Sequence, residues 1–336
     1  MHEIDLEKYE IRTDMLVDLT DEDEKQYKQN VSYKDDVKIS WLNLEKENKL
    51  NKPAGNYLTL EFSDVTDTDN LNKVKNVFKE EFLKMLNLIG YNKSMKTCVI
   101  GLGNKNSTPD SLGPKVTDKV IVTKHLFDMH QSVDERFSSV SAFYPGVTGQ
   151  TGIETSDFIK AIIDNIKPDL VILIDALSSS SISRVNKSIQ VTDSGITPGS
   201  GVGNKRKEIS KKTIGVPVVA IGIPTVTSAS VIVADTINYM MKNFAYNKKL
   251  SDKKINKFIN RPVNYLNGKV NVSINDKKTF LGLVGTLSFD ELSKLVYEVL
   301  TPIGYNLMVT PKEVDFVIEK LSDLISFVIN NTLHNI

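Results

Sequence analysis

The sequence is poor in the residues that disulfide frameworks, metal centres and membrane spans require. Among its 336 residues are one cysteine, Cys98, one tryptophan and four histidines. A lone cysteine forms no internal disulfide and fits a reducing compartment, which excludes an extracellular disulfide scaffold. No apolar stretch reaches the roughly 18 to 20 residues of a membrane helix, and the first residues lack a secretory signal. We therefore expect a cytoplasmic protein with no membrane partner.

The formal net charge is zero, since 42 basic side chains balance 42 acidic ones. This balance does not indicate nucleic acid as a direct partner. The charges are unevenly distributed, however, because residues 1–70 hold 18 acidic and 9 basic side chains. The first 36 residues are dense in charge and sparse in apolar residues, which predicts a loosely attached arm.

The central part of the chain alternates short apolar β-branched runs with amphipathic helical patterns. Such alternation predicts a doubly wound α/β fold with a mostly parallel sheet. We expect strands at 97–103, 138–143, 170–176, 188–192 and 216–223, and helices at 111–127, 153–166 and 228–243.

Additional elements are expected on both sides of this core. A turn-forming cluster separates two alternating stretches, which predicts a hairpin or two edge strands. We expect these strands at 37–43 and 56–62, a helix at 71–89, a C-terminal strand at 279–284, and helices at 288–300 and 311–332.

Two aspartates follow expected strands, at the sheet edge where α/β proteins collect reactive groups. Asp110 precedes a helix in the loop after the first core strand, and Asp175 ends the run LVILID. Two neighbouring carboxyl groups can share a proton, so that one activates water while the other protonates a leaving group. The alternatives are that Asp110 is a helix N-cap and that Asp175 anchors a loop.

Two glycine-rich loops lie among the same segments. The loop 145–155 offers backbone N–H groups that can hold an oxyanion or a substrate backbone. The loop 193–212 is long enough to be functional, but it lacks the spacing of a nucleotide phosphate loop. The candidate residues are Gly146, Gly149 and Gly152 in the first loop and Gly199 and Gly201 in the second.

Other catalytic patterns are missing. The sequence contains neither HExxH nor GxSxG, which argues against a zincin or an α/β-hydrolase serine enzyme. Cys98 lies inside an apolar strand and is expected to be a core residue. We expect no cofactor and no metal ion.

Five blocks of sequence, in this order, resemble the germination protease family of endospore-forming bacteria. The likeness extends from residue 9 to the end of the chain. The blocks are GLGNKNSTPDSLGP (101–114), PGVTGQTGIETSD (145–157), IDALSSSSISRVNKSIQVTDSGITPGSGVGNKRKEIS (174–210), GVPVVAIGIPTV (215–226) and GYNLMVTPKEVD (304–315).

This resemblance implies an endopeptidase that degrades small acid-soluble spore proteins early in germination. It further implies synthesis as a zymogen in the forespore, a homotetramer in the spore core, and a fold similar to that of the hydrogenase-maturation peptidases. The essential aspartates of the family correspond to Asp110 and Asp175. A metal-dependent maturation-type peptidase and a non-catalytic spore-protein binder remain alternatives.

The resemblance also implies a pro-segment that ends in an Arg-Thr-Asp motif. Cleavage is then expected between Asp14 and Met15, leaving 15–336 as a single peptidase domain with a core at about 71–243 and additions at about 262–336. The sequence Asp14-Met15-Leu16-Val17-Asp18 is similar to the pattern cut in spore proteins, so the segment can imitate substrate. The chain departs from the family pattern at Leu16, Thr197 and Ser228.

Overall fold

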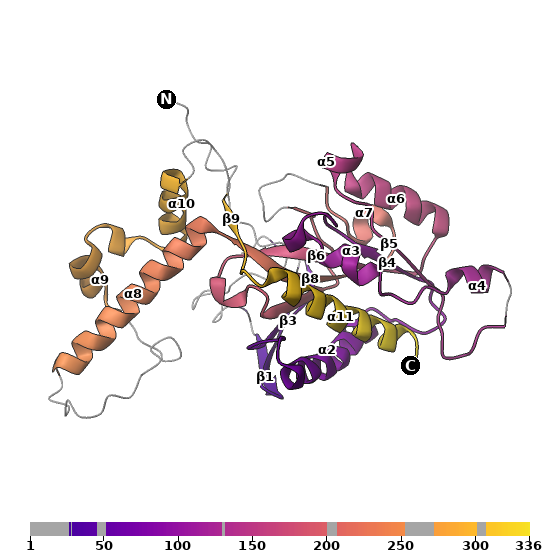
Figure 1. The fold of residues 1–336 in the computed structure, drawn as a ribbon, viewed down its shortest axis with the longest axis horizontal. Helices are drawn as coiled ribbons and strands as arrows, with labels where there is room; N and C mark the ends of the chain where they lie inside the picture. Colours follow the sequence, from indigo (N-terminus) through magenta and orange to yellow (C-terminus); the bar gives the residue numbers. More distant parts are fainter. Residues whose placement is uncertain are drawn as a thin grey trace. The chain divides into compact units, whose positions relative to one another are not determined.

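The computed structural model describes residues 27, 29–45, 52–129, 132–199, 207–252, 272–300 and 307–336. The expected pro-segment, its cleavage site at Asp14 and Met15, and Gly201 lie outside these residues. Two compact units are distinguished by their internal contacts, one ending at Val226 and resuming at Thr310, the other formed by Thr227–Val309 (Figure 1).

The first unit is built on a mixed sheet with the strand order β1-β2-β3-β7-β8-β6-β4-β5. Parallel pairing joins β4 to both β5 and β6, and antiparallel pairing joins β1, β2, β3, β7 and β8 in that order. The strands are β1 (Asn30–Lys34), β2 (Val37–Leu44), β3 (Gly55–Glu61), β4 (Thr97–Gly101), β5 (Val140–Phe143), β6 (Leu170–Ser179), β7 (Ser188–Thr192) and β8 (Val218–Ser228).

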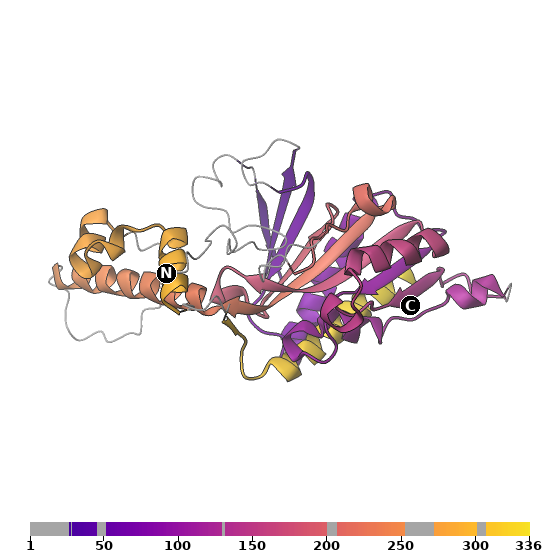
Figure 2. The same cartoon turned by 90° about the horizontal axis from the view of Figure 1, so that it is seen from above.

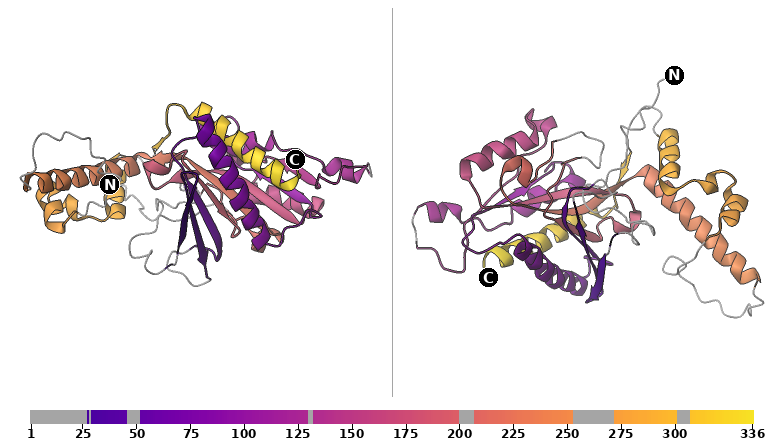
Figure 3. Two further views of the ribbon diagram at one scale, coloured as in Figure 1. Left: turned by 90° about the horizontal axis from the view of Figure 1, so that it is seen from below. Right: turned by 180° about the vertical axis from the view of Figure 1, so that it is seen from behind.

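Helices cover both faces of this sheet, and the predicted α/β class with added N-terminal strands is confirmed (Figures 2 and 3). On one face, α2 (Thr68–Leu88), α3 (Leu112–Thr117) and α11 (Val314–Leu333) share a continuous apolar core with the strands. On the other face, α6 (Thr155–Ile166) and α7 (Lys211–Ile214) pack against β4, β6 and β8. Burial of both faces explains why β4 and β6 are almost wholly apolar.

The unit Thr227–Val309 contains three helices among its described residues. They are α8 (Ala229–Asp252), α9 (Ile274–Leu281) and α10 (Phe289–Leu300), together with the 3₁₀ turn η5 (Val284–Thr286) and the short strand β9 (Met308–Val309), which pairs with the end of β8. Every helix in the described part of the chain is too short or too polar to cross a membrane.

Three sequence predictions about local structure were wrong. The expected strand at 279–284 is instead the end of α9 followed by η5, because the Ser273 side chain caps a helix that begins upstream and the apolar run continues it. Residues 30–34, which were expected to belong to a loosely attached arm, instead form strand β1. The strand is held by backbone pairing to β2, while every one of its side chains is exposed.

The third error concerns the helix expected at 111–127. Helix α3 ends at Thr117, and a separate short helix, α4 (Lys124–Asp128), follows. Between them, the N–H of Ile121 donates to the Asn330 side chain on α11, and the N–H of Thr123 donates to the carbonyl of Val140 on β5. Tertiary hydrogen bonds therefore take the backbone groups that a continuous helix needs.

Two glycines bring α3 into direct backbone contact with the sheet. A Cβ on Gly101 would lie 2.2 Å from the carbonyl oxygen of Gly113, and a Cβ on Gly113 would lie 2.3 Å from the carbonyl oxygen of Leu102. Backbone atoms cannot move aside as a flexible side chain can, so α3 has to shift to accept a methyl group.

Gly113→Ala is expected to destabilise the protein by about 3 kcal/mol, because overpacking against backbone strains the core. Thermal unfolding monitored by circular dichroism measures the loss. Gly149→Ala is the matched control, because no atom lies within 4 Å of the added Cβ. Equal melting temperatures for the two variants would contradict the close approach.

Candidate active site

The two predicted aspartates lie next to the point where the parallel pairing of β4 with β6 ends, Asp110 in the loop after β4 and Asp175 inside β6. Strand β6 continues to Ser179, so the prediction that Asp175 lies at the carboxyl end of its strand was wrong. Gly101, the last residue of β4, pairs with Ile174 of β6, so Asp175 is the first residue beyond that pair. The N–H of Leu102 donates to the carbonyl of Ile174 at 2.7 Å. The loop that carries Asp110 therefore begins level with Asp175, and its 3₁₀ turn η2 (Thr108–Asp110) contacts β6.

Asp110 is held by the turn itself and by a hydrogen bond from the start of the loop. Its N–H donates to the Ser107 carbonyl at 2.9 Å. The N–H of Asn104 donates both to the Asp110 carbonyl at 3.1 Å and to its carboxylate Oδ2 at 2.8 Å. Gly103 has a φ of 108°, and a Cβ there would lie 2.2 Å from the Asp110 carbonyl, so this tight loop requires glycine.

Asp110 does not cap the helix that follows it. The N-cap of α3 is Ser111, which makes no side-chain capping hydrogen bond. Its hydroxyl donates instead to the Thr108 carbonyl at 2.8 Å. The Asp110 carboxyl group is directed back to Asn104, so the N-cap alternative for Asp110 is wrong.

Burial gives Asp110 an unusual proton affinity. Loss of water around the carboxyl group raises its pKa from 3.8 to about 6, although the hydrogen bond from the Asn104 N–H acts in the opposite direction. A carboxyl group that titrates near neutral pH can both donate and accept a proton at useful rates. This property is characteristic of an acid–base catalyst.

Asp175 is buried more deeply, with 4% of its surface exposed. The N–H of Ala176 donates to its Oδ1 at 2.9 Å. Strand β6 lies inside the sheet between β4 and β8, so Asp175 is fixed by rigid neighbours on both sides. The site thus holds one carboxyl group on a strand and another on a tight turn.

The glycine-rich loop after β5 is joined to the loop of Asp110. The Gln150 side chain donates through Nε2 to the Asn104 Oδ1 at 2.7 Å. The sequence analysis missed both residues, whose only signal was their polar side chains inside the two loops. The structure places Gly146 and Gly152 in left-handed conformations around α5 (Thr148–Thr151), leaves Gly149 in open space, and gives Gly199 a φ of 68°.

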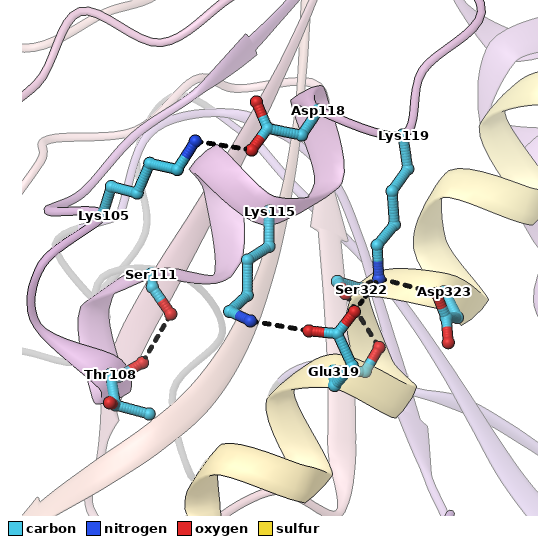
Figure 4. A network of polar contacts seen from close by, with 9 residues as sticks. All are labelled: Lys105, Thr108, Ser111, Lys115, Asp118, Lys119, Glu319, Ser322 and Asp323. Atoms are coloured by element: carbon cyan, nitrogen blue, oxygen red, sulfur yellow. Dashed lines mark hydrogen bonds and ion pairs between the residues drawn. The ribbon is translucent and has the colours of Figure 1, made fainter.

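A charged network joins α3 and the residues after it to α11 (Figure 4). Lys115 and Lys119 both bind Glu319, and Lys119 also binds Asp323 at 2.6 Å. The hydrogen bonds from the two lysines lower the pKa of Glu319 to about 2. Because these groups are partly exposed, the network mainly orients α3 and contributes modestly to stability.

The remaining candidate groups have structural roles. Burial raises the pKa of Cys98 to about 11, which makes its thiol a poor nucleophile. The Ser228 hydroxyl, at one departure from the family pattern, bonds to that of Ser230 at 2.8 Å and accepts from the Val231 N–H at the start of α8. Within the described ranges, no group of three or more His, Cys, Asp or Glu is arranged to hold a metal ion. We therefore derive no step through a metal.

The fold is an α/β fold whose sheet carries Asp175 inside β6 and Asp110 in the loop after β4. The sequence model of the germination protease family, peptidase family A25, matches residues 6–336. Germination proteases of Bacillus licheniformis and of Bacillus cereus strain AH187 are each 45% identical, covering 98% and 99% of this chain and 95% and 96% of the relatives. The chain belongs to the germination protease family and is a peptidase of spore germination.

A solved structure is also similar in part. The nickel–iron hydrogenase maturation protease of Thermococcus kodakarensis KOD1 aligns with 39% of this chain and 74% of its own, at 18% sequence identity and a TM-score of 0.25. The fold assignment rests on the sheet and helices described above.

Proposed function

We propose that the protein is an endopeptidase that initiates the degradation of small acid-soluble spore proteins, through an acid–base pair formed by Asp110 and Asp175. The observation that carries the proposal is the partly buried Asp110 carboxyl group, whose pKa is about 6, on a loop that begins beside Asp175. Membership of the germination protease family supports the protein substrate.

The proposed reaction divides the proton transfers between the two carboxyl groups. Asp175 accepts a proton from water as the oxygen attacks the peptide carbonyl carbon. Asp110 then donates its proton to the amide nitrogen as the carbon–nitrogen bond breaks. Transfer of the gained proton from Asp175 to Asp110 restores the starting state. Backbone N–H groups around Gly146, Gly149 and Gly152 are proposed to stabilise the oxyanion.

The proposal includes a self-processing zymogen that is made in the forespore and acts in the spore core as a homotetramer. The pro-segment is residues 1–14, cleaved between Asp14 and Met15 to leave a mature peptidase domain of residues 15–336. Its sequence after Arg12 is similar to the pattern that the family cuts in its substrates, so the same acid–base pair serves both reactions.

Self-processing is expected to slow as pH rises above 6. Asp110 has to be protonated to act as the acid, and with a pKa of about 6 its protonated fraction falls roughly tenfold per pH unit above that value. The rate of loss of residues 1–14, followed by intact-mass spectrometry between pH 5 and 8, measures this dependence. A rate that is constant over this range would contradict the assignment of the acid to Asp110.

The function itself is tested by incubating the full chain with a purified small acid-soluble spore protein at mildly acid pH. Fragments of the spore protein and a chain beginning at Met15 are the expected products. A parallel incubation with chelators distinguishes the metal-dependent alternative, in which cleavage stops. Stable binding without fragments would overturn the proposal in favour of a non-catalytic binder.

A further inference from the structure

The turn that carries Asp110 is fastened to the sheet by one buried hydroxyl group. Thr225, on β8, is 1% exposed. Its Oγ1 donates to the carbonyl oxygen of Pro109 at 2.6 Å. Pro109 is the residue before Asp110, so its carbonyl belongs to the peptide plane that leads into Asp110.

A second threonine, Thr310, forms a hydrogen bond with the backbone of Thr225. The Thr310 hydroxyl donates to the carbonyl oxygen of Thr225 at 2.8 Å. This hydrogen bond ends on the backbone carbonyl of Thr225 and the bond to Pro109 begins at its side-chain hydroxyl, so together they link Thr310 and Pro109 through Thr225. We term this pair of hydrogen bonds the threonine clasp. All three residues belong to the α/β unit.

The clasp lies where the chain leaves the α/β unit and returns to it. The α/β unit ends at Val226, directly after Thr225, and resumes at Thr310. The clasp therefore joins the exit point and the return point of the chain to the turn that carries Asp110. The Thr225 hydrogen bond ends on Pro109, the residue next to Asp110, and this position suits a role in placing the Asp110 carboxyl group.

We propose that Thr225 is a positioning residue for Asp110 and that Thr310 supports it. Resting on the acid–base function proposed for Asp110, the argument is geometric. Holding the Pro109 carbonyl fixes the rotation of the Pro109–Asp110 peptide plane, while the Asp110 N–H is held by Ser107 at 2.9 Å. With both sides of that peptide plane fixed, the backbone that carries the Asp110 side chain is fixed, and the Asn104 N–H, 2.8 Å from Oδ2, then sets the direction of the carboxyl group.

Removing the hydroxyl tests this role. Thr225→Val keeps the shape of the side chain but leaves the Pro109 carbonyl without its donor. We expect kcat for spore-protein cleavage to fall by about 10- to 100-fold with KM nearly unchanged, because small misplacements of a reactive group cost this much. Thr225→Ser, which restores the hydroxyl, is expected to recover most of kcat. Thr310→Val is expected to produce a smaller loss of the same kind.

Thr117→Val is the matched control. The Thr117 hydroxyl is also buried and also donates to a backbone carbonyl, that of Pro114 at 2.8 Å, but within α3. The control is expected to lose a similar amount of stability in thermal unfolding and to keep its kcat. A Thr225→Val enzyme with unchanged kcat, or one whose loss matches that of Thr117→Val, would overturn the proposal.

A titration makes the outcome independent of turnover. The Asp110 carboxyl carbon, observed by carbon-13 NMR, is expected to titrate at a different pH in Thr225→Val than in the wild type, and at an unchanged pH in Thr225→Ser and Thr117→Val. If the wild type cleaves no spore protein, the proposed function fails, while the titration still decides whether the clasp positions Asp110. Identical titrations in all four proteins would refute the clasp.

Discussion

Asp110→Asn is expected to lower kcat by about 10²- to 10⁴-fold, the range typical of general acid–base catalysis. The amide has the shape of the carboxyl group and accepts the same hydrogen bond from the Asn104 N–H, at 2.8 Å in the wild type. It cannot donate the proton that the departing amine requires. Cleavage of a small acid-soluble spore protein, followed by mass spectrometry, measures the loss.

The same substitution is expected to stabilise the fold at neutral pH. The pKa of Asp110 is about 6 in the folded chain against an ordinary value of 3.8, so the folded state binds the proton more tightly than the unfolded state. The contribution of Asp110 to wild-type stability therefore decreases as pH rises from about 4 to about 6, in total by about 3 kcal/mol. The stability of Asp110→Asn relative to the wild type should increase by that amount over this interval.

Asp118→Asn provides the comparison for both measurements. Asp118 lies directly after α3, is exposed, and pairs with Lys105 at 2.7 Å, so its loss should change kcat and stability little. Denaturant unfolding at pH 4 and pH 7.5 measures the free energy of unfolding of the wild type, Asp110→Asn and Asp118→Asn. If Asp110→Asn turned over substrate normally, the proposed mechanism would be wrong. If its relative stability did not depend on pH, the burial argument would fail.

Asp175→Asn is expected to cause a loss of the same order as Asp110→Asn. Asp175 is 4% exposed and is fixed by the Ala176 N–H at 2.9 Å, so the amide can occupy the same position. It cannot accept a proton from the attacking water. Single-turnover cleavage assays on the folded variant measure the loss.

The variant with both substitutions distinguishes a pair from two independent groups. Because the proposed steps pass one proton between the two carboxyl groups, the double variant should be about as slow as either single one. If the loss in kcat of the double variant equalled the product of the two single losses, Asp110 and Asp175 would act independently. Asp169→Asn is the control, since Asp169 lies directly before β6, where its carboxylate accepts a hydrogen bond from the Lys96 N–H at 2.8 Å. It should cleave normally.

Much of the core could be predicted from local pattern. Strand β4 and the first half of β6 are apolar runs because both of their faces are covered, and such runs are visible in any sequence. Asp110 and Asp175 could be identified as candidates because each follows one of those runs. Helices α2, α6 and α11 were found because their buried residues recur at helical spacing.

Elements held by partners distant in sequence could not be predicted in this way. Strand β1 exists through backbone pairing with β2, which leaves no trace in its exposed side chains. The break after α3 depends on hydrogen bonds to Asn330 and Val140, more than a dozen residues away in sequence. Asn104, Gln150 and Thr225 joined the site only once their loops and strand were packed together.

The sequence by itself determined the α/β class and marked the two carboxyl groups as candidates beside apolar strands, because strand period and apolar content are local properties. Only the tertiary structure decided that the Asp110 carboxyl group is partly shielded from water, that its pKa is about 6, and that Thr225 holds its turn. The physical reason is that a proton affinity depends on the water excluded and the dipoles presented by all surrounding segments. Those segments are brought together only by folding.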